Sequence, residues 1–391
     1  KKSQALLSEP KSPLSPNSAL SVRRSTFSVQ GVHLYLHIPF CHRICPYCSF
    51  YKHTPGKTDL GAFVDALLAE ARFAAQKDLP PVKTIYFGGG TPSMLSPTHL
   101  TRLFTGLREA FDFSNIEEVT LEANPATFTS RTAQLYQDLG VTRVSLGVQS
   151  FLGKHLETLG REHTPMQAIT SVHLLREASD LEVNIDLIFS VPGQSLLDWE
   201  DTLTQALALQ PEHLSAYNLT YEEDTAFFEK FQTGDYQDNP DLNAEMFSLG
   251  EEILTTAGYE HYETSNYALP AKRSRHNEGY WVGNDYLGLG PSAVSTLNRT
   301  RHQNVCDTAD YLKRIASLGH AQDDIEILDD EAWRLERIAL QLRTAEGLPL
   351  EFLAPNTNLA SISHLVEETA THLRLIGEGP LLVDSIAAEL A

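Results

Sequence analysis

Cysteine and cationic side chains are scarce in this 391-residue chain, and long apolar runs are absent. Four cysteines exclude a fold built on many disulfides and are typical of a reducing compartment, so we expect a cytoplasmic protein. Lys and Arg number 30 against 51 Asp and Glu, and the resulting charge of −21 argues against nucleic-acid binding, which needs clustered cations. No stretch reaches the roughly 18 consecutive apolar residues of a membrane-spanning helix. The length and the 42% apolar content fit one large globular domain plus a smaller one.

The first 30 residues differ in composition from the rest of the chain. Residues 1–30 hold eight serines, three prolines and five basic residues, but a single acid, Glu9. Such a segment cannot bury enough apolar surface to fold, and we predict a disordered extension. A Ser-rich, basic and acid-poor segment also fits a transit peptide, which would place the protein in a mitochondrion or plastid instead.

Three of the four cysteines lie close together, in the run Cys41-His-Arg-Ile-Cys45-Pro-Tyr-Cys48. Three thiolates at this spacing suit an iron–sulfur cluster better than a zinc ion, which needs a fourth ligand nearby. A 4Fe–4S cluster held by three cysteines keeps one iron open to a small molecule. The alternatives are a disulfide between two of the thiols, ordinary buried cysteines, or a zinc-binding scaffold without redox chemistry. Cys306 lies far downstream in a polar setting without a second motif.

Apolar, strand-like runs alternate with amphipathic segments from residue 31 onward. We predict helices over Leu60–Ala71, where apolar residues recur at helical spacing, and over Pro165–Ala178. Repeated strand-then-helix units predict a parallel sheet with right-handed crossovers, and six units are too few for a closed eight-stranded barrel. The six runs are His33–Ile38, Thr84–Phe87, Val119–Ala123, Val141–Val148, Val183–Phe189 and His213–Leu219.

The cysteine loop and the six units together resemble the radical S-adenosylmethionine (SAM) superfamily. The resemblance covers most of residues 31–300 and implies an α/β fold, an open partial (β/α)6 barrel. It also implies a 4Fe–4S cluster held by Cys41, Cys45 and Cys48, whose open iron chelates SAM. In such barrels the chemistry gathers at the C-terminal ends of the strands.

Polar residues and glycines follow the predicted strands at that end. Gly88-Gly-Gly-Thr-Pro92 follows the second strand, and a tight turn explains it as well as a ligand does. A cap or a satisfied core pair explains each polar residue taken singly. As a set they resemble the oxygen-independent coproporphyrinogen III oxidase family, which implies one SAM molecule, and room for a second from Gln149 onward. The implied SAM-binding residues are Tyr35, Gly89, Gly90, Thr91, Glu122, Gln149, Arg161 and Asp186.

Two positions separate the branches of this family. The oxidases carry a fourth cysteine two positions beyond the third, where this chain has Phe50. The run from Ser274 to Trp281 matches the H-N-x-x-Y-W motif of the HemW-type heme chaperones, with His276 as the implied heme ligand. A solvent-exposed or core-bonded histidine is the alternative for His276. Val294 stands where relatives usually have a histidine, which puts heme affinity in question.

The resemblance therefore favours a heme chaperone, with the oxygen-independent coproporphyrinogen III oxidase as the alternative. It leaves open whether SAM is cleaved to a 5′-deoxyadenosyl radical or only completes the cluster and gates transfer. The implied partners are heme, a heme-acceptor protein and an electron donor such as a flavodoxin or ferredoxin, with peripheral membrane contact during heme delivery. No nucleic acid is expected.

The last part of the chain, residues 301–391, resembles the small C-terminal domain of the same family. We predict a mostly helical, winged-helix-like domain with helices over Glu331–Leu342 and Ile362–Ile376, a short strand at Pro380–Val383 and a last helix. The expected role of this domain is a lid that covers the barrel mouth and excludes water.

Overall fold

The computed structural model describes residues 31–355 and 357–391. The extension predicted over residues 1–30, and with it the transit-peptide alternative, lies outside the described residues. Within them, no helix combines the length and apolar character needed to cross a bilayer.

Twelve strands form one large sheet, and all six predicted strand runs are confirmed as members of it. Seven strands pair in parallel, and the others join by antiparallel pairing. The parallel strands are β1 (Val32–Ile38), β2 (Val82–Gly89), β3 (Glu118–Ala123), β4 (Arg143–Gln149), β5 (Glu182–Phe189), β6 (His213–Asn218) and β9 (Tyr286–Leu289); the others are β7 (Glu260–Glu263), β8 (Asn266–Ala268), β10 (Val294–Leu297), β11 (Thr300–Asn304) and β12 (Gln322–Ile327).

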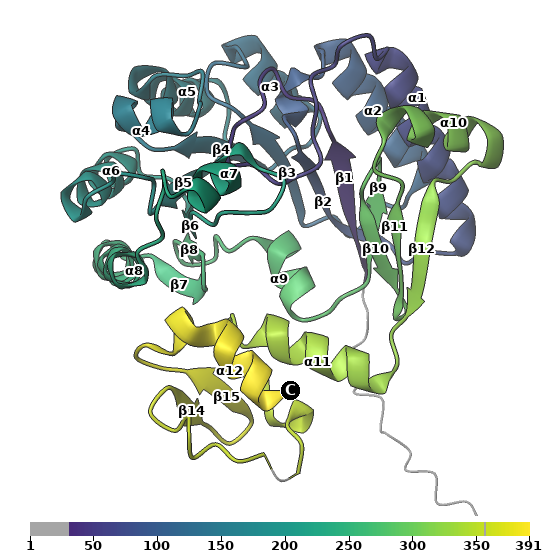
Figure 1. Ribbon diagram of the computed structural model, residues 1–391. Helices are drawn as coiled ribbons and strands as arrows, with labels where there is room; N and C mark the ends of the chain where they lie inside the picture. The colour runs from purple at the N-terminus through teal and green to yellow at the C-terminus, as the bar shows by residue number, and fades with distance from the viewer. Residues whose placement is uncertain (1–30, 356) are drawn as a thin grey trace, which may run out of the picture.

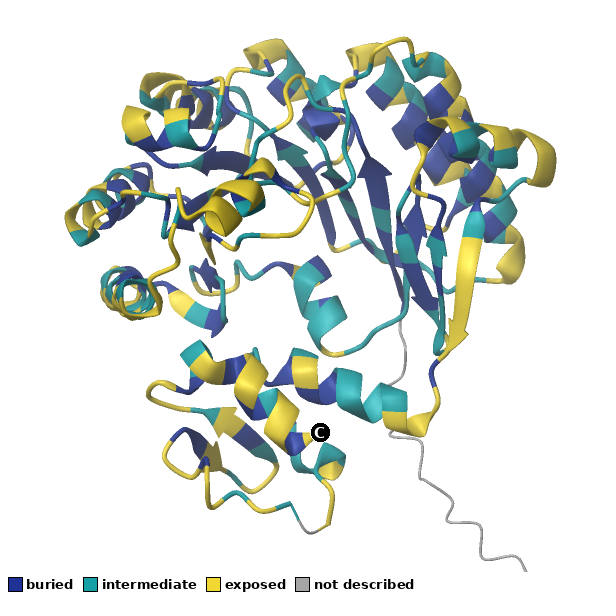
Figure 2. Cartoon of the chain, in the orientation of Figure 1, coloured by how far each residue is buried: buried dark blue, intermediate teal, exposed yellow. Residues whose placement is uncertain are grey.

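The sheet is an open, partial barrel, because its strand order ends in two edges. The order is β12-β11-β10-β9-β1-β2-β3-β4-β5-β6-β8-β7, and β12 does not pair with β7. The central strands are buried almost throughout, as strands covered on both faces must be (Figure 2). Figure 1 shows the sheet curving, with helices α1 to α6 and α8 on its outer side. These helices and the remaining ones before residue 320 are α1 (Leu60–Ala74), α2 (Pro97–Ala110), α3 (Ser130–Asp138), α4 (Gly153–Thr158), α5 (Pro165–Ala178), α6 (Leu196–Ala208), α7 (Ala226–Thr233), α8 (Pro240–Thr256), α9 (Arg275–Trp281) and α10 (Thr308–Leu318), with 3₁₀ turns η1 (Ala75–Lys77) and η2 (Pro92–Met94).

Local sequence signals account for the outer helices. The helix predicted over Pro165–Ala178 is confirmed as α5; Pro165 stands at its first position, and Thr164 and Gln167 form a capping box. The helix predicted over Leu60–Ala71 is confirmed as α1, whose N-cap Asp59 accepts hydrogen bonds from two backbone amides.

A second, smaller core lies after the large sheet. Its buried side chains run from Ile338 to Leu390, whereas β11, α10 and β12 still belong to the large sheet and its core. We therefore propose that the small domain begins near Asp329, not at residue 301. Its elements are α11 (Asp330–Gln341), β13 (Leu348–Pro349), η3 (Leu350–Phe352), β14 (Val366–Glu368), β15 (His372–Leu375), η4 (Gly379–Leu382) and α12 (Val383–Leu390).

Two elements predicted for the small domain are wrong, although its first and last helices are confirmed. Residues 362–376, predicted as a helix, contain the β14–β15 hairpin, and 380–383, predicted as a strand, begins with a 3₁₀ turn. The hairpin turn is fixed by Thr369, whose hydroxyl accepts from the amide of His372 at 2.9 Å. Leu373 of the hairpin is fully buried in the small core.

The small domain does not cover the barrel mouth, so the predicted lid is wrong. It lies against α9 and the open side of the barrel, toward the end where the parallel strands begin (Figure 1). Backbone contacts join it to the β7–β8 turn: the amide of Thr264 donates to Arg343 O and that of Ala345 to Tyr262 O, both at 3.0 Å.

A buried carboxylate ties α1 to the β9–β12 part of the sheet. Glu70 accepts hydrogen bonds from the amide of Gly290 (2.8 Å), the side-chain amide of Asn304 (2.7 Å) and the hydroxyl of Tyr311 (2.7 Å). Burial nevertheless raises the pKa of Glu70 to about 7.

This raised pKa predicts a pH dependence of folding stability. Folded Glu70 keeps its proton at pH values where the unfolded chain has lost it, so its contribution is complete below about pH 4.5 and is lost as pH rises through 7. Between pH 5 and pH 8, the wild type should lose on the order of 2 kcal/mol more unfolding free energy than Glu70→Gln, measured by denaturant titration. Glu109→Gln, at an exposed position, should follow the wild type. Parallel pH profiles for the wild type and Glu70→Gln would contradict this.

Candidate functional site

The cysteine loop follows β1 at the mouth of the barrel. Cys41, Cys45 and Cys48 are all partly buried and unpaired, so the disulfide alternative is not realised. The loop is anchored on both sides: the amide of Cys41 donates to His53 O at 3.0 Å, and that of Phe227 donates to Pro46 O at 3.1 Å.

A chain of hydrogen bonds joins two of the thiols through the strand ends. The hydroxyl of Thr91 donates to Cys41 Sγ at 3.5 Å and accepts from Asn124 Nδ2 at 2.8 Å. Arg161 in turn binds Asn124 Oδ1 and donates to Cys45 Sγ at 3.5 Å. Donors aimed at cysteine sulfur suit anionic, metal-bound thiolates, so these residues fit an iron–sulfur cluster.

The same residues do not form a site for one metal ion. Across residues 31–355 and 357–391, no three His, Cys, Asp or Glu side chains converge as a single ion requires. A cluster spreads its ligands over several irons, so its cysteines need not converge. Burial raises the pKa of Cys41 and of Cys48, which means that metal binding must compensate the cost of forming the thiolates.

Two carboxylates project into the barrel just inside the mouth. Glu122 accepts from the hydroxyl of Tyr86 (2.9 Å) and the amide of Gly89 (3.2 Å), and Asp186 accepts from the hydroxyl of Ser145 (2.9 Å). Burial, and then the charge of Asp186, raises the pKa of Glu122 to about 7; burial raises the pKa of Asp186 to about 6. A cationic ligand between them would relieve this repulsion.

The glycine run packs backbone against backbone at the end of β2. A side chain at Gly90 would meet the carbonyl oxygens of Ile38 and Phe40 at 2.7 Å, and Gly89 has a φ of +103°. The Gly90 amide donates to Ile38 O at 2.8 Å, and the Gly89 amide is used by Glu122. The run therefore brings the strand end close to the cysteine loop, with these two amides already satisfied.

The other predicted mouth residues are also brought together. Tyr35 stacks on Tyr86 with 6.2 Å between ring centroids. Gln149 sits at a bulge in the β4–β5 pairing with a φ of +69°, a strained conformation that redirects its side chain toward Gly147. Arg161 donates to Gly147 O at 2.8 Å.

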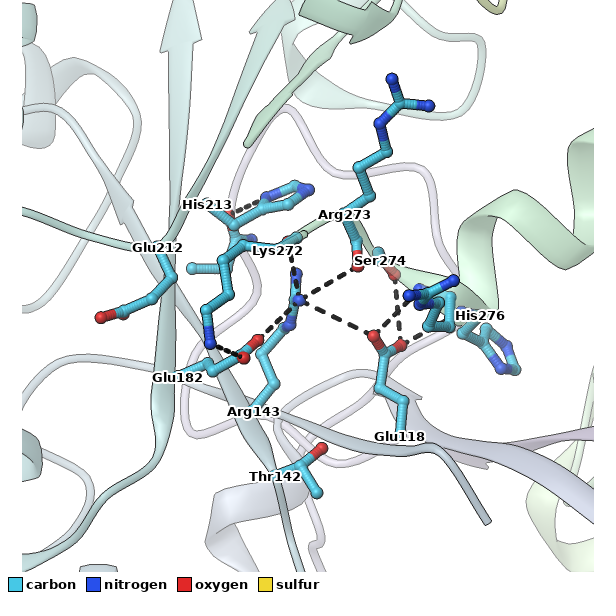
Figure 3. A network of polar contacts seen from close by, with 12 residues as sticks. Glu118, Thr142, Arg143, Glu182, Glu212, His213, Lys272, Arg273, Ser274 and His276 are labelled. Carbon is cyan, nitrogen blue, oxygen red and sulfur yellow. Dashed lines mark hydrogen bonds and ion pairs between the residues drawn. The ribbon is translucent and has the colours of Figure 1, made fainter. Parts of the chain in front are cut away.

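The H-N-x-x-Y-W run forms α9 at the opposite end of the barrel, where the strands begin. Glu118 holds the start of this helix, accepting from the amides of Arg275 (2.9 Å) and His276 (3.1 Å) (Figure 3). Arg143 lies 3.7 Å from Glu118 and donates to the carbonyl of Lys272 at 2.8 Å, which pins the segment before the helix. A buried carboxylate at a helix N-terminus is a favourable arrangement.

His276 is buried at the end of the barrel where the strands begin and has partners at both ring nitrogens. It is 1% exposed; its Nδ1 bonds Thr84 Oγ1 at 2.7 Å and its Nε2 bonds the hydroxyl of Tyr280 at 3.2 Å. The ring stacks on Tyr86 with 5.1 Å between centroids, so Tyr86 separates it from Glu122. Heme coordination by His276 stays a prediction, and it requires His276 to give up one of these partners.

A cleft of about 540 Å³ opens between α9, the β10–β11 hairpin and α11. Tyr280 and Trp281 of the motif line it, and Trp281 Nε1 is buried without a hydrogen-bond partner among the described residues. Val294 is not part of its wall. The sequence analysis did not identify the other aromatic and cationic side chains of the cleft, because they come from segments that are distant in sequence. These side chains are Tyr217, Tyr286, Trp333, Arg301, Arg337 and Arg343.

Comparison with known proteins agrees with this geometry. The Radical SAM superfamily model matches residues 35–206. "Heme chaperone HemW" of Lactococcus lactis is 36% identical over 81% of this chain and 83% of its own length, and HemW of Escherichia coli is 34% identical over 90% and 96%. The chain belongs to the HemW family.

The solved structure of coproporphyrinogen III oxidase (HemN) from Escherichia coli, a radical SAM enzyme, confirms the fold. It matches with a TM-score of 0.81 over 92% of this chain and 90% of that one, at 24% identity. Membership of the radical SAM superfamily implies that this protein uses a 4Fe–4S cluster and SAM.

Asn124 is a mouth residue that the sequence did not single out. It lies within Leu121-Glu-Ala-Asn-Pro125 at the end of β3, and its amide joins Thr91 to Arg161. A polar residue at a parallel strand end is the signal that marks it.

The contacts of Arg161 predict that it orders the cysteine loop even without metal. In metal-free protein, Arg161→Gln should raise the hydrogen-exchange rate of residues 41–48 roughly ten- to hundredfold, because charge-assisted bonds of 1.5–3 kcal/mol are lost. Arg176→Gln is the matched control, since Arg176 pairs with Glu212 away from the loop. Unchanged exchange in residues 41–48 of the Arg161 variant would show that the loop is held by other contacts.

Proposed function

We propose that this protein is a radical SAM heme chaperone that binds heme in the α9–α11 cleft and passes it to an acceptor protein. One observation carries the proposal: the two aromatic residues of the H-N-x-x-Y-W run line this cleft together with three arginines. Flat aromatic surfaces suit a porphyrin face, and guanidinium groups suit its two carboxylates. The unpartnered Trp281 Nε1 offers a further donor.

At the other end of the barrel, Cys41, Cys45 and Cys48 would hold the cluster. When bound, the cluster and SAM supply one-electron chemistry at the mouth. Glu122 and Asp186 would bind the cationic part of SAM, and the other SAM-binding residues predicted above would complete the site. The two carboxylates gain from a cation, since burial and mutual repulsion disfavour their charges.

The heme-chaperone function also implies partners and a location for this protein. A heme-acceptor protein and a low-potential electron donor such as a flavodoxin or ferredoxin complete the proposal, with peripheral membrane contact during delivery. The reducing cytoplasm is the proposed location.

The cysteine loop predicts which variants lose the cluster. After anaerobic reconstitution, the wild type should hold about four iron and four sulfide per chain, and Cys45→Ala should lose the cluster. Cys306→Ala is the matched control, because Cys306 is exposed and distant in sequence. Iron and sulfide analysis with absorption spectra tests this, and full cluster content in Cys45→Ala would overturn the assignment.

A single reconstituted sample separates the chaperone from the oxidase. The protein should bind hemin in a titration and should not convert coproporphyrinogen III to protoporphyrinogen IX with SAM under reducing, oxygen-free conditions. Phe50, 69% exposed, occupies the position of the oxidases' fourth cysteine. Hemin binding without decarboxylation supports the proposal. Decarboxylation without hemin binding would reverse it.

A further inference from the structure

The walls of the cleft restrict which atom can bind iron. Among the described residues that line it there is no His, Cys or Met, and the side chains able to act as axial heme ligands are three tyrosines. Its two glutamates are engaged: Glu263 accepts from Asn266, and Glu336 pairs with Arg301 and Arg337.

The hydroxyls of the three tyrosines have different surroundings. That of Tyr280 lies 3.2 Å from Nε2 of His276, whose N–H can donate to a phenolate oxygen. That of Tyr286 accepts from Thr296 at 3.0 Å, and burial, followed by the charge of Asp186, raises the pKa of Tyr217. Burial raises the pKa of Tyr280 as well, so its imidazole contact and not its acidity distinguishes Tyr280 from the other two.

We propose that Tyr280, as a phenolate hydrogen-bonded to His276, is the axial ligand of ferric heme in this cleft. The inference rests on the heme-chaperone function proposed above. His276 is then a positioning residue and not the iron ligand, in agreement with its burial and its two occupied nitrogens. The spacing supports the pair, since residues four apart share one face of a helix.

A line of hydrogen bonds orients His276 toward Tyr280. Asn284 Nδ2 donates to Nε2 of His33 at 3.3 Å, so Nδ1–H of His33 donates to Thr84 Oγ1 at 2.7 Å. The Thr84 hydroxyl then donates to Nδ1 of His276 at 2.7 Å, which leaves Nε2–H of His276 to donate to Tyr280. His33 lines a second cavity of about 740 Å³. Within α9, residues 277 and 280 line only the first cavity, 275, 278 and 279 line only the second, and Trp281 lines both.

Coordination of ferric heme by Tyr280 needs no redox partner. The iron–oxygen bond forms and the Tyr280 O–H bond breaks, a water leaves the iron, and the iron stays ferric. That water forms from the hydroxide that ferric heme carries in neutral solution, which takes the Tyr280 proton and leaves the iron. Nε2–H of His276 then donates to the bound phenolate.

Resonance Raman and EPR spectra of the full chain, reconstituted anaerobically and titrated with hemin, test the proposal. The wild type should show iron–phenolate vibrations and a high-spin ferric signal. Tyr280→Phe should lose both and bind hemin at least roughly tenfold more weakly. Tyr286→Phe, which removes a hydroxyl from the same cleft, should keep both. His276→Gln should keep bound hemin but shift the iron–phenolate vibration, because the phenolate loses its imidazole partner.

Two different results would contradict the tyrosine assignment and the chaperone function. A low-spin, histidine-type spectrum that survives Tyr280→Phe and disappears in His276→Gln would overturn the tyrosine assignment and leave the chaperone function standing. Absence of hemin binding by the wild type would overturn the chaperone function, and this inference with it. Equal thermal unfolding of Tyr280→Phe and the wild type shows that any spectral loss is not a folding defect.

Discussion

The contact between Glu118 and the start of α9 is the constraint on which the candidate cleft depends. A carboxylate that is 4% exposed accepts hydrogen bonds from the amides of Arg275 and His276 and the hydroxyl of Ser274, with Arg143 at 3.7 Å. Removing one partner of such a buried charge pair costs about 3–5 kcal/mol. The contact fixes α9 across the beginning of β2 and β3, and one face of α9 then becomes a wall of the cleft.

The barrel therefore has two candidate sites, the mouth and the cleft, with packed aromatic side chains between them. Tyr86 is one of these side chains: its hydroxyl donates to Glu122 near the mouth, and its ring stacks on His276 near the cleft. In the proposed function, the cluster and SAM at the mouth and heme at the far end are thus separated within one domain. The small domain completes the cleft through α11 and does not shield the mouth.

Sequence reasoning predicted the parts of this arrangement that depend on local pattern. The six strands follow from apolar runs, α5 from apolar residues on one side of the 165–178 segment, and the cysteine loop from spacing within eight residues. It failed where distant segments meet. The placement of α9 depends on Glu118 and Arg143, more than 130 residues away. The helix predicted over residues 362–376 gave way to a hairpin, because Thr369 forms a turn and Leu373 is buried against the small core.

Hydrogen exchange with and without hemin tests the central claim, that heme binds at the α9–α11 end and the cluster at the mouth. On the reconstituted protein, hemin should slow exchange in α9, α11 and the β10–β11 hairpin, and leave residues 41–48 and 88–91 unchanged. Protection of residues 41–48 and 88–91, with none in α9 and α11, would contradict the account and place heme at the barrel mouth.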